Sequence, residues 1–192
     1  MTEEYLLGVD IGTSSTKGVL MNSEGDVLAS SYVEHEVNVV KPGWVEQDPI
    51  KCYWDDFRIV IREILKRSKV SPRYIVGVGV SGLSPSIVPV DKSGNPIRMA
   101  IIYSDRRAIH ECRELVERVG LEEIIRTTGN FPDPYFAGYK ILWYKRMEGE
   151  KYRKTWKILN AEKFVVFKLT GKAVIDKATA SIYAPYFDIR RG

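Results

Sequence analysis

The sequence predicts an α/β fold in which a strand-rich part, about residues 1–105, precedes a helical part, about residues 106–170. In the first part, short apolar runs are bounded by Gly, Asn, Asp and Ser, which is typical of strands joined by turns. After residue 105, apolar residues recur at spacings of three and four, the period of an amphipathic helix. This order favours a mixed sheet flanked by helices, with a helical insertion.

The strands are expected in two groups. A continuous apolar run, Tyr74–Val80, predicts a central strand that is buried on both faces. Ile87–Val90 and Met99–Tyr103 flank a turn at Asp91–Pro96, which predicts a hairpin or a pair of adjacent strands. Ahead of these, three strands are expected at Tyr5–Val9, Lys17–Met21 and Val27–Val33, with a turn at Asn22–Gly25.

The first helix is expected to begin at Asp48, with its side chain as the N-cap and Pro49 at the first helical position. Apolar residues of this helix share one face, and Ser71-Pro72 ends it. Later helices are expected at Ala108–Val119, Leu121–Thr127, Ala137–Arg146, Glu148–Thr155 and Ala161–Leu169.

The first two strands enclose a turn with the composition of a phosphate-binding hairpin. Gly12 has no Cβ, so the backbone can approach a phosphate closely, while Thr13 and Ser14 add hydroxyl donors. Asp10 repels phosphate, but a carboxylate suits a hydrated Mg²⁺ ion. The alternative is an ordinary hairpin in which Asp10 and Thr13 only satisfy hydrogen bonds of the turn. A P-loop and a Rossmann glycine motif are both missing.

Composition excludes several classes of protein. At 192 residues, the chain is long enough for one domain. With 29 basic and 25 acidic residues, its net charge of +4 predicts neither a nucleic-acid nor a membrane partner. Without a signal sequence or a long apolar segment, a cytoplasmic location is expected. Cys52 and Cys112 are expected to be reduced, and isolated His35 and His110 receive no catalytic role.

Four motifs in order resemble the amino-terminal domain of the FGGY family of carbohydrate kinases. They are the Asp10–Ser14 turn, Pro42–Pro49, Ser104–Arg107 and Thr128-Gly129. The resemblance covers nearly the whole chain and implies an actin-like ATPase fold, which is also described as ribonuclease H-like.

The resemblance implies transfer of the ATP γ-phosphoryl group to a sugar or polyol hydroxyl, with Mg²⁺ as the second cofactor. This chain is then the sugar-binding half, residues 1–192, of a kinase with two domains. The carboxyl-terminal ATP-binding domain and the catalytic Asp would lie downstream, so the chain alone is expected to be inactive. A homodimer is also common in the family.

The resemblance also assigns the site residues. Asp10 would orient Mg²⁺, and Gly12, Thr13 and Ser14 would lie against the transferred phosphate. Lys17 would add positive charge there or, alternatively, face solvent.

Five residues are assigned to the sugar: Ser84, Tyr103, Asp105, Arg106 and Tyr135. Asp105 follows a strand and is expected to face the cleft; the alternative is that it caps the next helix. The two tyrosines would line the pocket, or belong to the core.

The substrate follows less directly. Gly82–Ser86 stands where xylulokinases have Gly-Gln-Met-His-Gly and glycerol kinases an Arg-Glu pair. Asp133–Gly138 resembles a glycerol kinase segment, whereas Pro42–Pro49 resembles xylulokinase-related proteins. A ketopentose is preferred, with glycerol, another polyol or gluconate as alternatives. A non-enzymatic sugar- or nucleotide-binding module and a partner-driving ATPase are alternatives of other classes.

Overall fold

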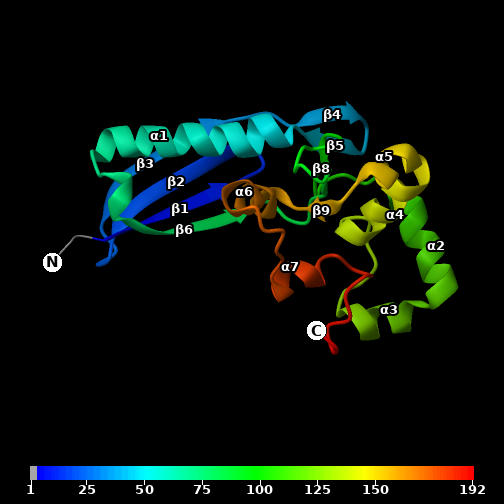
Figure 1. Ribbon diagram of the computed structural model, residues 1–192. Helices are drawn as coiled ribbons and strands as arrows, with labels where there is room; N and C mark the ends of the chain where they lie inside the picture. The colour runs from blue at the N-terminus through cyan, green and yellow to red at the C-terminus, as the bar shows by residue number, and fades with distance from the viewer. Residues whose placement is uncertain (1–3) are drawn as a thin grey trace.

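A four-stranded mixed sheet forms one end of the molecule in the computed structural model, which describes residues 4–192 (Figure 1). Its strand order is β3-β2-β1-β6. The first three strands are antiparallel and the fourth runs parallel to β1, so the expected mixed sheet is confirmed. The strands are β1 (Tyr5–Ile11), β2 (Ser15–Asn22), β3 (Val27–Glu34) and β6 (Ile75–Gly82).

Helix α1 (Asp56–Ser68) covers one face of this sheet (Figure 1). The expected cap is confirmed, since the Asp48 side chain accepts hydrogen bonds from the backbone N–H groups of Ile50 and Lys51. The first turns are a π-helix, Pro49–Asp55. Close packing depends on Gly18 of β2, where a Cβ would lie 2.6 Å from the Val60 side chain of α1.

Strand β6 differs from the expected central strand. It is the last strand in the order of the sheet, and Val76 and Val78 are 58% and 49% exposed. Helix α1 packs mainly on β2 and β3, so part of the β6 surface stays uncovered. An apolar run specifies a strand, but its place in the sheet depends on contacts distant in the sequence.

Of the two arrangements expected for residues 87–103, a hairpin or a pair of adjacent strands, the structure shows adjacent segments without a regular hairpin. Strand β7 pairs with β9, whereas β8 pairs with β5, and an isolated bridge between Ile87 and Ile101 joins the two segments. Strands β4, β5 and β9 are too short to carry a clear period and were not predicted. The bounds are β4 (Asn38–Lys41), β5 (Trp44–Gln47), β7 (Val88–Val90), β8 (Ala100–Ile101) and β9 (Lys157–Leu159).

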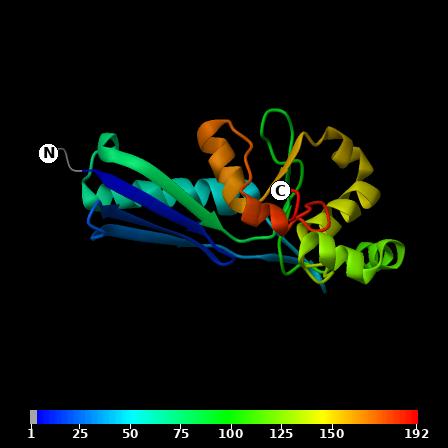
Figure 2. The same ribbon diagram turned by 90° about the horizontal axis from the view of Figure 1, so that it is seen from below.

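The helical part lies at the other end of the molecule, and Figures 1 and 2 both show α2 to α5 away from the four-stranded sheet. The five helices expected after residue 105 are confirmed within a few residues at each end, and the last of them, α6, packs on η1 and β6. The helices are η2 (Pro72–Tyr74), α2 (Ile109–Val119), α3 (Leu121–Thr128), α4 (Ala137–Met147), α5 (Gly149–Lys154), α6 (Ala161–Thr170) and α7 (Lys177–Ser181).

Both cysteines, Cys52 and Cys112, are free and buried, as expected. In the part of the chain that the structure describes, no helix has the length and apolar character needed to cross a membrane.

Candidate functional site

The turn between β1 and β2 is compact and leaves no room for a side chain at Gly12. Its N–H donates to the Ser15 carbonyl over 2.9 Å, and a Cβ on Gly12 would lie 2.9 Å from that same oxygen. Any other residue would therefore displace the turn. The sequence-based explanation for Gly12 was close approach of the backbone to a phosphate. The structure adds that the turn itself has no room for a side chain here.

Asp10 stands near the end of β1, on the sheet face opposite α1. Its neighbours in register are Lys17 on β2 and Ser81 on β6, so all three side chains share this face. The Ser81 hydroxyl donates to Asp10 Oδ1 over 2.7 Å and so orients the carboxylate. Among residues 4–192, no three His, Cys, Asp or Glu side chains gather to hold a metal. One exposed carboxylate still fits Mg²⁺, which retains most of its waters.

A cavity of about 380 Å³ opens beside this turn. Its walls come from the turn, from the end of β6 and from two later loops, so it joins segments that are far apart in the sequence. Six of the predicted site residues lie here together. The lining residues are Asp10, Gly12, Thr13, Gly82, Leu83, Ser84, Tyr103 and Tyr135.

Two tyrosines form the aromatic side of the cavity. The rings of Tyr103 and Tyr135 meet edge to face, with centroids 6.1 Å apart. The Tyr135 hydroxyl donates to the Ser84 carbonyl over 3.1 Å, and the Thr13 hydroxyl lies 3.4 Å from that of Tyr103. Burial raises the pKa of Tyr135, with the neighbouring Tyr103 as a smaller cause. These contacts connect the phosphate turn to the aromatic wall.

Ser14 and Lys17 lie outside this cavity. Both line a larger hollow of about 800 Å³ over β2 and β3. Lys17 also lines a shallow hollow with Asp10, so it faces the open side of the sheet near the carboxylate. The structure thus places both on the sheet side of the turn.

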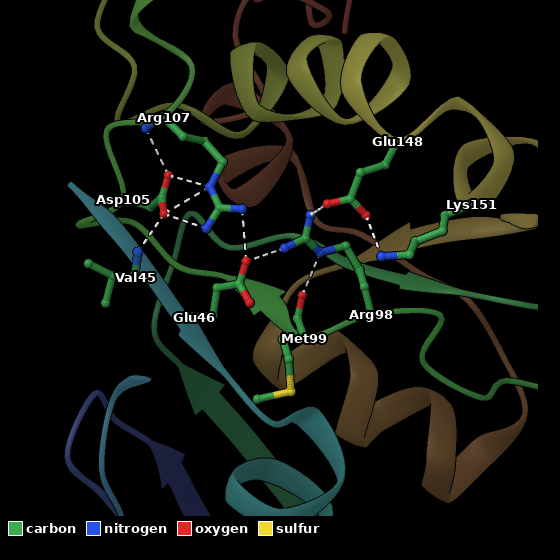
Figure 3. Close-up of polar contacts among 8 residues, drawn as sticks. All are labelled: Val45, Glu46, Arg98, Met99, Asp105, Arg107, Glu148 and Lys151. Carbon is green, nitrogen blue, oxygen red and sulfur yellow. Dashed lines mark hydrogen bonds and ion pairs between the residues drawn. The ribbon is translucent and has the colours of Figure 1, made fainter. Parts of the chain in front are cut away.

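The expectation that Asp105 faces the cleft is wrong. Its side chain is fully buried, and it accepts hydrogen bonds from the Val45 N–H at 2.5 Å and from Arg107 at 2.8 Å (Figure 3). The alternative helix cap is also not observed, because the N-cap of α2 is Ala108. Sequence position alone could not show that a buried guanidinium takes both oxygens of this carboxylate.

Arg106 is also outside the cavity. Its guanidinium pairs with both oxygens of Asp133, at 2.5 and 3.1 Å. Asp133 in turn accepts a hydrogen bond from the Tyr135 N–H over 2.7 Å. Arg106 therefore supports the loop that carries Tyr135 and does not itself line the site.

The Asp105 and Arg107 pair belongs to a buried ionic network, the Glu46 network, shown in Figure 3. Glu46 forms ion pairs with Arg107 at 2.8 Å and with Arg98, which also pairs with Glu148 at 2.6 Å. Burial lowers the pKa of Arg98, and the two glutamates oppose that shift. This network joins β5 to the helical part and fixes the chain that leaves the cavity after Tyr103.

Three buried polar side chains that were not predicted as site residues lie behind the cavity walls. The His35 ring contacts the Gly12 carbonyl oxygen at 3.1 Å. Lys140 on α4 donates to the carbonyl oxygens of Pro134, at 2.8 Å, and Tyr135. Asn160 contacts the Ser84 hydroxyl at 3.1 Å. The partners of His35 and Asn160 are distant in the sequence, whereas those of Lys140 lie only five and six residues before it.

Comparison with known proteins shows the family of this chain. The FGGY family of carbohydrate kinases, N-terminal domain, matches residues 5–192. The chain is 30% identical over 177 residues to a xylulose kinase from Staphylococcus xylosus, covering 92% of this chain and 36% of that protein. It is 32% identical over 185 residues to a glycerol kinase from Thermococcus onnurineus, covering 93% and 37%.

The solved structure of a xylulose kinase from Rhodospirillum rubrum superimposes with a TM-score of 0.90 at 27% identity. The match covers 98% of this chain and 38% of that one, so the chain spans a little over a third of the relatives it matches. The expected actin-like α/β fold is confirmed by this likeness. The chain belongs to the FGGY family of carbohydrate kinases, whose N-terminal domain it matches over nearly its full length.

Proposed function

We propose that this chain is the sugar-binding half of a kinase that transfers the γ-phosphoryl group of ATP to a sugar hydroxyl. The observation that carries the proposal is the cavity in which the turn at Asp10 and Gly12 faces Ser84 and two tyrosines. A phosphate-binding turn and a polar, aromatic pocket within one cavity suit an acceptor hydroxyl held beside a transferring phosphate.

The residues present fit positioning and charge stabilisation, which supply most of the catalysis in phosphoryl transfer. Asp10 would hold a hydrated Mg²⁺, a cation that neutralises charge on the phosphate oxygens when bound. Gly12 allows the backbone to approach the phosphate, and the Thr13 hydroxyl adds a donor. Tyr103 and Tyr135 present aromatic surfaces against which the C–H faces of a sugar can pack.

A ketopentose is the preferred substrate, and glycerol, another polyol or gluconate are the alternatives. Relatives named as xylulose kinase and as glycerol kinase support this range without choosing within it. By the family resemblance, xylulokinases and glycerol kinases carry different residues at the positions of Ser84 and Pro85. This wall of the cavity would therefore determine which of the two substrates is accepted.

A second domain would supply the adenosine pocket and the catalytic Asp. Support comes from the lengths of the relatives, because this chain covers only 36–38% of each of them. The uncovered side of β6, at the end of the sheet order, is consistent with contact to further chain.

The test is a coupled assay of ADP release from the protein expressed over its whole reading frame. Xylulose, ribulose, gluconate and glycerol are offered separately, and the 192-residue chain is assayed in parallel. Stimulation by one compound in the longer protein alone supports the kinase and identifies its substrate. ATP hydrolysis that no sugar alters favours the partner-driving ATPase, and sugar binding without turnover favours the non-enzymatic module.

A further inference from the structure

The side chain of Asn160 lies directly behind the wall of the sugar cavity. Asn160 is fully buried, and its Nδ2 lies 3.1 Å from Ser84 Oγ and 2.6 Å from Glu162 Oε1. Ser84 lines the cavity, whereas Asn160 and Glu162 do not. The three residues form a buried polar chain that ends at the cavity, called here the Ser84 chain.

Helix formation does not account for this arrangement. Asn160 is the N-cap residue of α6, a position where asparagine commonly caps the helix with its side chain. Its side chain makes no capping hydrogen bond, and the Ala161 N–H at the start of the helix is bound by Ser86 Oγ at 3.1 Å. The amide nitrogen of Asn160 instead contacts Ser84 and the side chain of Glu162 in the first turn of α6.

Glu162 determines which way the Asn160 amide faces. Burial raises the pKa of Glu162. In its ionised form this carboxylate can only accept hydrogen bonds, and the amide atom 2.6 Å from its Oε1 is then the nitrogen. The two hydrogens of that nitrogen then go to Glu162 and to Ser84. With the amide reversed, two acceptors would meet in a buried site, which is costly.

Ser84 must consequently accept from Asn160 and has one proton left to donate. Within residues 4–192, no acceptor is found for the proton of the Ser84 hydroxyl. The backbone carbonyl of Ser84 is a separate group and accepts from the Tyr135 hydroxyl. The cavity is the open side of this residue. Because Asn160 donates to this hydroxyl from behind, the serine proton is not used there and stays free to donate toward whatever occupies the cavity.

We propose that Glu162 and Asn160 are positioning residues that fix Ser84 as a hydrogen-bond donor to a substrate oxygen. The substrate class is then one that places a hydroxyl or carbonyl oxygen against Ser84. A sugar lacking that oxygen offers no partner to the serine proton, and sites built to hydrogen-bond a substrate oxygen discriminate against analogues that lack it. The inference rests on the proposed function and adds a device for specificity to it.

The test compares Ser84→Ala, Asn160→Asp and the double variant in the coupled assay, with the sugar that gives the best turnover. Asp at position 160 accepts from Ser84 and so takes the proton meant for the substrate. Each single variant should raise KM for the sugar on the order of tenfold, the loss of one hydrogen bond, with little change in kcat or in KM for ATP. The double variant should be no worse than Ser84→Ala, because both changes remove the same bond.

Deoxy sugars provide a measurement that would not change if Asn160 and Glu162 had a merely structural role. The wild-type protein should reject one deoxy analogue, and Ser84→Ala and Asn160→Asp should lose discrimination against that same analogue. Glu162→Gln replaces the carboxylate with a neutral amide, so the Asn160 amide can turn, and this variant should also raise KM. It takes the place of Asn160→Asp if that variant fails to fold. Asn38→Asp, the same change on exposed strand β4, is the matched control and should leave KM unchanged.

The outcomes separate the two claims. If the wild type shows sugar-dependent turnover but Asn160→Asp and Glu162→Gln keep its KM and its discrimination, the positioning inference is overturned and the kinase stands. Additive losses in the double variant also overturn the inference. If the wild type shows no sugar-dependent turnover, the proposed function fails and this inference fails with it.

Discussion

The ring of His35 lies 3.1 Å from the carbonyl oxygen of Gly12, so a buried histidine holds the turn proposed to bind phosphate. Because a carbonyl only accepts hydrogen bonds, the ring nitrogen facing it carries a proton. The other ring nitrogen lies 2.8 Å from Asp56 Oδ2 on α1, and both side chains are almost fully buried. His35 thus connects the turn to α1, the helix that covers one face of the sheet.

Replacing His35 by Ala should destabilise the protein and slow turnover. The change leaves the Asp56 carboxylate buried without its partner, so the free energy of unfolding should fall by about 1–3 kcal/mol. Turnover should also fall because the turn loses its support. Urea denaturation and the ADP assay measure the two effects. His110→Ala, on the exposed surface of α2, is the control, and equal effects of the two variants would contradict this role.

Asp10→Asn should abolish most activity without unfolding the protein. Asparagine can still accept from Ser81, but it lacks the charge that holds Mg²⁺. The kcat of the whole kinase should fall by about 100-fold or more, while the free energy of unfolding changes by less than about 0.5 kcal/mol. An activity titrated against Mg²⁺ measures the effect. Unchanged kcat and Mg²⁺ dependence would remove Asp10 from the cation site.

Lys140 should make stability rise with pH in the alkaline range. Burial lowers the pKa of Lys140 from 10.5 to about 7; Asp105 and Asp133 oppose the shift, whereas Arg106 and Arg107 add to it. Between these values the unfolded chain holds a proton that the folded protein has lost. The free energy of unfolding therefore increases as pH rises from about 7 toward 10, and below 7 this contribution stays constant.

Lys140→Met removes that titration. Urea denaturation at pH 6.5 and pH 9 should show the wild type gaining more stability than the variant as pH rises. Lys145→Met, on the exposed side of the same helix, should behave like the wild type. Parallel pH profiles of the wild type and Lys140→Met would show that Lys140 keeps an ordinary pKa.

Arg107→Lys should destabilise the protein although charge is kept. The guanidinium binds both oxygens of Asp105 and also pairs with Glu46, and an ammonium cannot match that geometry. We expect a loss of about 2–4 kcal/mol, since the change breaks buried ion pairs. Thermal or urea unfolding measures it, with exposed Arg118→Lys as control. A loss below about 0.5 kcal/mol would show that lysine restores the network.

Local patterns predicted the features that depend on neighbours in the sequence. The Asp48 cap and the turn at Gly12 are of this kind, because their partners lie within a few residues. Strand β6 was recognised as a strand, but its place at the end of the sheet order depends on which elements pack against it. An apolar run contains no information about that packing.

The site was predictable only where a motif marks it. Ser84, Tyr103 and Tyr135 were assigned from the family resemblance, and they lie in one cavity. Asp105 was misplaced because tertiary packing brings the Val45 N–H to it and buries its pair with neighbouring Arg107. The same reason hid His35 and Asn160, whose contacts join segments far apart in the sequence.

A crystal structure of the whole protein with its sugar and a non-hydrolysable ATP analogue tests the central claim most directly. We predict the sugar in the cavity between the Gly12 turn and the two tyrosines, with one sugar oxygen within hydrogen-bond distance of Ser84 Oγ. The acceptor hydroxyl should face the γ-phosphate beside Asp10. A sugar bound elsewhere, with Tyr103 and Tyr135 free of contact, would contradict the assignment of this cavity.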